Sequence, residues 1–315
     1  MSTQSQTNVT IGLGFLERVI LSTLTTLPCC VFFFINGTML FTLRSKLVFR
    51  ETSRYTLLCN LLFSDTMQMA LGQILYLLSS CRIMVTYPFC GLLVMFANLT
   101  NEVSPLTLVV MSLERYVAVC YPLRHATIIT IRNTAVAIIV VWAFCSLNVL
   151  IRVLLLLDFP FSDLDSLQMN HLCSTLIMFL GSMSDIYDKA YTCFLFVSAG
   201  VAVISSYIGV VIAARSASTD KASARKARNT LLLHLVQLGL SLSSTIFNPF
   251  LLVISKVVSR VVLMRMQNVL YVCFFILPRC LSSLIYGLRD QTIRPILVYY
   301  LCCRLTFLSK IHSVN

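Results

Sequence analysis

Long apolar stretches separated by short polar segments follow one another along the whole chain. Seven of them are long enough to cross a membrane: residues 19–43, 55–80, 84–113, 133–157, 190–214, 230–254 and 266–288. About 20 apolar residues in a helix span about 30 Å of hydrocarbon, whereas a lone strand would leave its backbone groups unpaired in lipid. The pattern therefore predicts an all-α membrane protein, a seven-transmembrane helix bundle, in which the long third helix is tilted.

The composition supports a lipid environment. Hydrophobic residues make up 58% of the chain and charged residues 11%, with a mean hydropathy of +0.87. A soluble helical protein, the alternative, would need polar faces that these stretches lack. The stretches account for most of the 315 residues, so we expect one domain over 1–315. It would consist of an amino-terminal segment (1–18), a helix bundle (19–288) and a tail (289–315).

Basic residues outside the stretches are divided unevenly between the two sets of loops. One set carries Arg44, Lys46, Arg50, Arg54, Arg115, Arg124, Arg132, Arg215, Lys221, Arg225, Lys226, Arg228, Arg289, Arg294, Arg304 and Lys310. The other carries Arg18, Arg82, Lys189, Lys256, Arg260 and Arg265. Because loops rich in Lys and Arg stay in the cytoplasm, the division predicts an extracellular amino terminus and a cytoplasmic carboxyl terminus. The net charge of +12 is then mainly a topology signal, and it favours anionic membrane lipid over nucleic acid as a partner.

This orientation makes two kinds of modification accessible. Asn8-Val9-Thr10 is a glycosylation sequon on the extracellular side, so we expect a glycan at Asn8. Cys302 and Cys303 follow the last stretch on the cytoplasmic side. They are candidates for palmitoylation, with two free thiols as the alternative. The first stretch has no convincing cleavage site before it and is expected to act as its own insertion signal.

The clearest motif is the run Met111–His125, MSLERYVAVCYPLRH, at the inner end of the third stretch. Its acid-Arg-Tyr triplet, Glu114, Arg115 and Tyr116, is followed by Cys-Tyr-Pro-Leu. This layout resembles the end of the third helix in the rhodopsin-like (class A) seven-helix receptors. It resembles in particular the odorant receptors, whose typical form is Met-Ala-x-Asp-Arg-Tyr-x-Ala-Ile-Cys-x-Pro-Leu. The run Pro-Arg-Cys-Leu-Ser-Ser-Leu-Ile-Tyr-Gly in the seventh stretch is similar to fish odorant receptors.

Other segments resemble the same family, in the same order along the chain. They are Asp65 within Leu-Phe-Ser-Asp, Trp142 in the fourth stretch, the pair Ser206-Tyr207, and Lys226-Ala227-x-x-Thr230 followed by His234. One segment departs from the pattern, because Leu281–Tyr286 stands where most class A members have Asn-Pro-x-x-Tyr. A proline is a common source of helix kinks, so no kink is expected at that position.

The resemblance implies a sensory receptor rather than an enzyme. A small odorant would bind in the extracellular half of the bundle. The sixth helix would then swing outward and expose the inner face to a heterotrimeric G protein, of the stimulatory olfactory type that raises cyclic AMP. The residues with an implied role in this coupling are Glu114, Arg115, Tyr116, Tyr207, Lys226, Arg228, His234 and Tyr286. The implied location is the plasma membrane, in the cilia of olfactory neurons.

The resemblance also implies a disulfide on the extracellular side. Cys90 occupies the place at the start of the third helix from which class A receptors form a disulfide to their second outer loop. Cys173 is the matching cysteine of that loop. Cys81 and Cys193 stay open as alternative partners, because connectivity cannot be read from spacing.

Charged residues inside the bilayer are the strongest candidates for functional residues, because each is energetically costly unless it faces protein or water. Asp65 and Arg279 lie in the second and seventh stretches and would face each other in a class A bundle. We predict that they pair, directly or through a water molecule. Glu102 recurs with Asn98 and Asn101 at helical spacing in the third stretch, one face of which lines the ligand cavity in class A receptors.

The sequence is compatible with two roles for Glu102. In the first its carboxylate binds a ligand, and in the second it is protonated and hydrogen-bonded to a neighbouring helix. Tyr191, Ser198 and Asn248 are further candidates for the pocket. Arg152, in the fourth stretch, would either attract an anionic ligand or extend to the membrane interface.

Other functional classes fit the chain less well. A retinal protein requires a Schiff-base lysine in the seventh stretch, which has none. The four histidines are scattered, and no metal-binding spacing or phosphate loop is present, so neither a metal nor a cofactor is expected. A seven-helix transporter is the leading alternative from another class, although the chain has no internal repeat. The nearer alternative is a class A receptor for a non-odorant ligand. The polar cavity positions favour a water-soluble odorant without identifying it.

Overall fold

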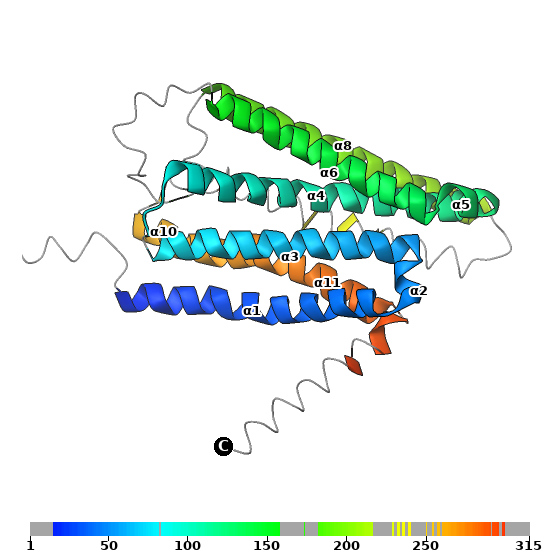
Figure 1. Cartoon of the computed structure of the whole chain (residues 1–315), viewed down its shortest axis with the longest axis horizontal. Coiled ribbons are helices and arrows are strands. Elements are labelled where there is room, and N and C mark those ends of the chain that lie inside the picture. Colours follow the sequence, from blue (N-terminus) through cyan, green and yellow to red (C-terminus); the bar gives the residue numbers. More distant parts are fainter. Residues whose placement is uncertain are drawn as a thin grey trace, which may run out of the picture.

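The computed structural model describes residues 15–81, 83–157, 173, 182–216, 260–290 and 292–295, with scattered positions between 229 and 258 and at 298–299. Within this part of the chain, six helices are long and apolar enough to cross a membrane, and they run side by side (Figure 1). They are α1 (Phe15–Ser45), α3 (Ser53–Ser80), α4 (Tyr87–Cys120), α6 (Ile131–Leu157), α8 (Ser182–Ser216) and a last helix made of α10 (Arg260–Tyr271), η2 (Val272–Ile276) and α11 (Leu277–Arg289). These confirm six predicted stretches. The other stretch, 230–254, lies mostly outside the described residues.

Three boundaries differ from the apolar pattern by six or more residues, and one of them is the start of the last helix, at Arg260 instead of 266. The α4 helix continues past residue 113 to Cys120, so the Glu114 triplet lies within the helix rather than at its exit. The α8 helix begins at Ser182, before the apolar stretch starts. Helices do not have to end where lipid ends, since their backbone hydrogen bonds form equally well in protein or water. The short helices α2 (Leu47–Arg50) and α5 (Pro122–Ile128) occupy the following connections, and Pro122 opens α5 where no N–H is required.

The last helix is irregular just before Pro278. The π-helical segment η2 ends at Ile276, and the N–H of Leu277 bonds to the carbonyl of Val272, five residues back. A proline has no N–H to give, and its ring clashes with the carbonyl four residues earlier, which accounts for a widened turn here. The helix therefore has a proline irregularity, although at a different place from the Asn-Pro position of most class A members. Phe275 of η2 also packs against Gly72 of α3, where a Cβ would overlap its ring.

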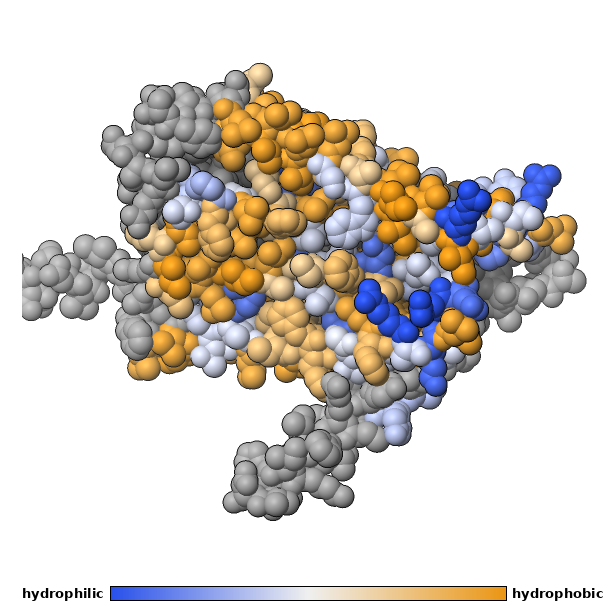
Figure 2. Space-filling model, viewed as in Figure 1, coloured by the Kyte–Doolittle hydropathy of each residue, from blue (hydrophilic) through white to orange (hydrophobic). Residues whose placement is uncertain are grey.

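The surface divides into apolar flanks and one basic end. Large apolar side chains are exposed along the lipid-facing sides of α6 and α8, among them Leu147 at 56% and Val201 at 62%. Figure 2 shows this apolar surface, and it shows hydrophilic side chains gathered at the end of the bundle where α2 and α5 lie. We call this end the basic end, because Lys46, Arg50 and Arg124 are exposed there. An apolar exterior of this kind is stable in lipid and unstable in water.

Candidate functional site

The end of α4 opposite the basic end is tied by a disulfide. Cys90, at the start of α4, is bonded to Cys173, and their Cα atoms are 5.7 Å apart. The bond closes a sequence separation of 83 residues. The two alternative partners, Cys81 and Cys193, are exposed free cysteines. The structure therefore contains the disulfide that the resemblance implied.

Glu102, in the middle of α4, is surrounded by hydrogen-bond donors from two other helices. Asn148 Nδ2 and Arg152 Nη2 of α6 donate to its Oε1, at 2.6 and 3.1 Å. Tyr191 of α8 donates its hydroxyl to Oε2, at 3.0 Å. Arg152 also contacts a second carboxylate, because its Nη1 lies 2.6 Å from Asp188 Oδ1. We call these five side chains the Glu102 cluster; it joins α4, α6 and α8.

The contacts in this cluster bear on the roles expected for Glu102 and Arg152. The hydrogen bonds to neighbouring helices, which one of the two expected roles of Glu102 requires, are present, and the three described partners donate to its carboxylate oxygens. A ligand role for Glu102 stays a prediction. The interpretation that Arg152 extends to the membrane interface is wrong, because its side chain is only 5% exposed. A buried guanidinium between Glu102 and Asp188 is compensated within the protein and has no need to reach water.

Replacing Tyr191 by Phe is expected to lower the thermal stability of the receptor. The change removes one donor from a buried carboxylate while preserving the ring, and one such bond contributes about 1 kcal/mol. The measurement is the melting curve of the detergent-solubilised protein. Tyr87→Phe is the matched control, because the Tyr87 hydroxyl makes none of the described hydrogen bonds. Equal melting temperatures for the two variants would contradict the assigned bond.

The second buried charge cluster joins α3, α4 and the last helix. Arg279 Nε lies 3.8 Å from Asp65 Oδ1, and both side chains are 3% exposed. Ser104 donates its hydroxyl to the same Asp65 oxygen at 2.7 Å. Arg279 Nη2 donates to Asn101 Oδ1 at 2.8 Å, and Nη1 donates to the carbonyl of Phe275 at 3.3 Å. The predicted pairing of Asp65 with Arg279 is present. Asn101, expected in the ligand cavity, is part of this network.

The triplet Glu114, Arg115 and Tyr116 lies at the basic end. Glu114 Oε2 accepts from Arg115 Nε at 2.8 Å, and His125 Nε2 of α5 lies 3.8 Å from Glu114 Oε1. The ring of Tyr116 packs on α8 at Gly209, where a Cβ would overlap it. Two other tyrosines expected at this end, Tyr207 and Tyr286, are respectively half-buried on α8 and buried on α11. Arg115 is thus held by its own neighbour on α4.

Asp290 also lies at the basic end, and the sequence did not identify it as a candidate. Its carboxylate accepts from the Tyr55 hydroxyl at 3.3 Å and lies 3.3 Å from Arg54 Nη2, both at the start of α3. It also accepts from the backbone N–H of Thr292 at 2.9 Å, as an N-cap does. The sequence signal was an Asp two residues past the end of the apolar stretch 266–288. Asp290 therefore fixes the end of α11 against α3.

Of the remaining residues expected in the site, the structure describes Asn98 and Ser198. Asn98 is half-buried on α4, and Ser198 is exposed on α8, where its hydroxyl bonds the carbonyl of Leu195 in the same helix. The others lie outside the described residues: Asn8, Lys226, Arg228, His234, Asn248, Cys302 and Cys303. Among the described residues, no group of three or more His, Cys, Asp or Glu comes together that could hold a metal ion.

Comparison with known proteins agrees with this geometry. Residues 35–286 match the 7 transmembrane receptor (rhodopsin family). The chain therefore belongs to the rhodopsin family of seven-transmembrane receptors, which are not enzymes. It is 31% identical to Odorant receptor 131-2 of Danio rerio over 99% of this chain and 95% of that protein. It is also 23% identical to Olfactory receptor-like protein I9 of Rattus norvegicus, over 80% of each chain, and 24% identical to Olfactory receptor 4K15 of Homo sapiens, over 78% of this chain and 74% of that protein.

Proposed function

We propose that the chain is an odorant receptor of the plasma membrane that activates a heterotrimeric G protein. The observation that carries the proposal is the similarity to Odorant receptor 131-2, which extends over 99% of the chain. The structure supports it by placing two groups at different depths of one helix. The Glu102 cluster lies in the middle of α4, and the Glu114–Arg115 pair lies near the basic end.

In the proposed mechanism, a small water-soluble odorant binds in the half of the bundle that carries the disulfide. Its contacts are drawn from Glu102 and its neighbours and from the expected pocket positions Asn98, Asn101, Tyr191, Ser198 and Asn248. The odorant acts by binding more tightly to the active state than to the resting state. In the active state Arg115 leaves Glu114, and the basic end opens to the G protein. Tyr116, Tyr207, Tyr286, Lys226, Arg228 and His234 complete that surface.

The proposal also includes the orientation and the cellular setting. The amino terminus with a glycan at Asn8 is extracellular, and the carboxyl terminus with palmitoylated Cys302 and Cys303 is cytoplasmic. Anionic lipid of the inner leaflet contacts the basic end. The G protein is the stimulatory olfactory type, and the receptor is located in the cilia of olfactory neurons.

The experiment is a ligand screen with a cyclic AMP reporter. Cells that display the full-length receptor are exposed to amino acids, amines, steroids and nucleotides. Cells without the receptor receive the same compounds as a control. We expect at least one class to raise cyclic AMP in a saturable manner. Expression of the transcript in olfactory epithelium would separate an odorant receptor from a class A receptor for an internal ligand. Transcript confined to other tissues would contradict the odorant assignment.

A further inference from the structure

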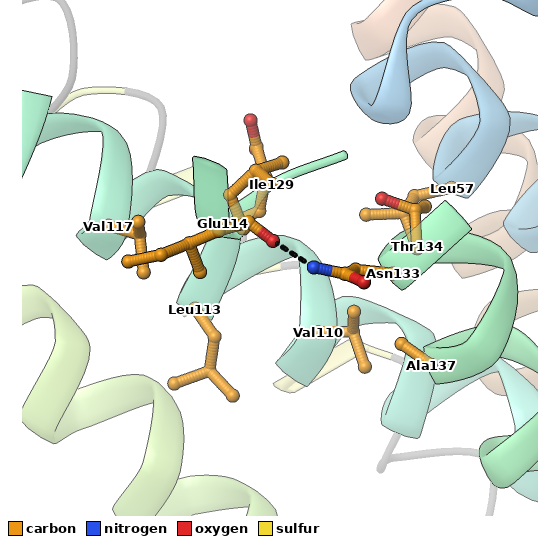
Figure 3. A pocket seen from close by; sticks show the side chains of 10 residues that line it. Leu57, Val110, Leu113, Glu114, Val117, Ile129, Asn133, Thr134 and Ala137 are labelled. Carbon is orange, nitrogen blue, oxygen red and sulfur yellow. Dashed lines mark hydrogen bonds between the residues drawn. The ribbon is translucent and has the colours of Figure 1, made fainter. Parts of the chain in front are cut away.

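A cavity of about 240 Å³ lies beside the Glu114–Arg115 pair, between α4, α5, α6 and α3 (Figure 3). Glu114 and Leu113 line it from α4, Ala137 from α6, Ile128 from α5 and Leu57 from α3. A void somewhat smaller than this, lined by Leu and Ile, holds a benzene-sized molecule in other proteins. The cavity is therefore large enough for a small organic ligand.

The cavity opens toward the flank of the bundle. Leu57 and Glu114 form its inner wall, with 2% and 6% of their surfaces exposed. Leu113 and Ile128 form its rim and are 45% and 42% exposed. Leu113 lies on the membrane-spanning helix α4, and an exposed apolar side chain on the flank of such a helix faces lipid. A ligand would therefore reach this cavity from the bilayer, which favours a molecule with an apolar body.

The lining also selects a head group. Its single formally charged residue is Glu114, and the other polar lining groups are Asn133 and Thr134. The Asn133 amide already donates to the carbonyl of Ile128 at 2.8 Å. Glu114 Oε2 is paired with Arg115 at 2.8 Å, whereas Oε1 makes none of the described hydrogen bonds, and His125 Nε2 lies 3.8 Å from it. A carboxylate oxygen at the inner wall of an apolar cavity complements a positively charged donor.

We propose that this cavity binds a small lipophilic amine. The apolar body lies between Leu113, Ile128 and Ala137, and the ammonium group donates to Glu114 Oε1. Because Glu114 also holds Arg115, a second cation on the same carboxylate weakens that pair. The amine consequently favours the state in which Arg115 is free, and this last step rests on the proposed function. The binding step does not.

The binding test uses purified full-length receptor in nanodiscs of neutral phospholipid, with n-hexylamine as the probe and n-hexanol as its uncharged match. Ala137→Phe fills the cavity, whereas Ala135→Phe adds the same ring to the exposed face of the same helix. We expect n-hexylamine to raise the melting temperature of the unchanged protein and of Ala135→Phe, and to bind Ala137→Phe about tenfold more weakly or worse. If Ala137→Phe does not fold, Ala137→Leu replaces it. Equal shifts in both variants, or an equal shift with n-hexanol, would overturn the site.

The signalling test uses the same preparations with a stimulatory G protein. Here n-hexylamine is expected to raise nucleotide exchange in the unchanged receptor and in Ala135→Phe, and not in Ala137→Phe. Amine binding without any change in exchange would overturn the link from Glu114 to Arg115. A receptor that binds the amine but gives no response to any compound of the ligand screen would count against the proposed function and not against the cavity.

Discussion

A receptor with Arg279 replaced by Met is expected to be largely lost from the cell surface. The change leaves the Asp65 side chain, which is 3% exposed, without its cation at 3.8 Å in the middle of the bundle. Removing one partner of a buried ion pair costs about 3–5 kcal/mol, because the other charge stays buried without compensation. It also removes the hydrogen bond to Asn101 on α4. Surface labelling of an amino-terminal epitope, with thermal stability in detergent, measures the effect.

Two further variants make this result specific. Arg132→Met removes an exposed arginine from α6 and is expected to leave surface expression unchanged. Exchanging the two charges, Asp65→Arg with Arg279→Asp, restores opposite signs and is expected to recover part of the expression lost in either single variant. Full expression of Arg279→Met, or no recovery in the exchanged pair, would show that the two residues are not coupled.

Replacing Arg115 by Ala is expected to reduce the cyclic AMP response strongly at equal surface levels of the receptor. In the structure Arg115 is paired with Glu114 at 2.8 Å, and its side chain is 20% exposed. Its loss leaves Glu114, whose side chain is 7% exposed, without this cation and is expected to lower stability, so the response is compared at equal surface levels. Its proposed role is contact with the G protein, so the response to the agonist found in the screen should fall by about tenfold or more, since a lost charged contact costs about 1.5–3 kcal/mol.

The control for that variant is Arg124→Ala on α5. Arg124 is exposed at the same end of the bundle, and its loss changes the net charge by the same amount. A similar fall in both variants would show a general effect of charge at the basic end. An unchanged response in Arg115→Ala, at equal surface levels, would contradict the assigned role of Arg115.

The sequence was sufficient for the features that depend on a single helix or on a strict energetic rule. Apolar length located six described helices, because the hydrocarbon thickness imposes a minimum on each. The pairing of Asp65 with Arg279 followed from the cost of an isolated charge in lipid together with the resemblance to class A receptors, which implied that the two residues face each other. The ends of α4 and α8 were missed because both helices continue through charged residues, Glu114 and Arg115 in α4 and Asp185, Asp188 and Lys189 in α8, which interrupt the apolar pattern.

The Glu102 cluster could not be assembled from the sequence. Its members come from three helices, and which faces meet depends on the rotation of each helix about its axis, which apolar stretches with few polar residues leave undetermined. Arg152 was considered alone for that reason, although Asn148 lies four residues before it on the same face of α6. Asp290 was missed for a related reason, because its partners Arg54 and Tyr55 are distant in sequence.

The most direct test of the proposed function is nucleotide exchange by purified components. The full-length receptor in nanodiscs is mixed with a stimulatory heterotrimeric G protein, and uptake of a labelled GTP analogue is followed with and without the agonist found in the screen. We expect the agonist to accelerate exchange in the unchanged receptor and not in Arg115→Ala. Exchange that is the same with and without agonist, in a receptor shown to bind that agonist, would contradict the proposal that this chain transmits ligand binding to a G protein.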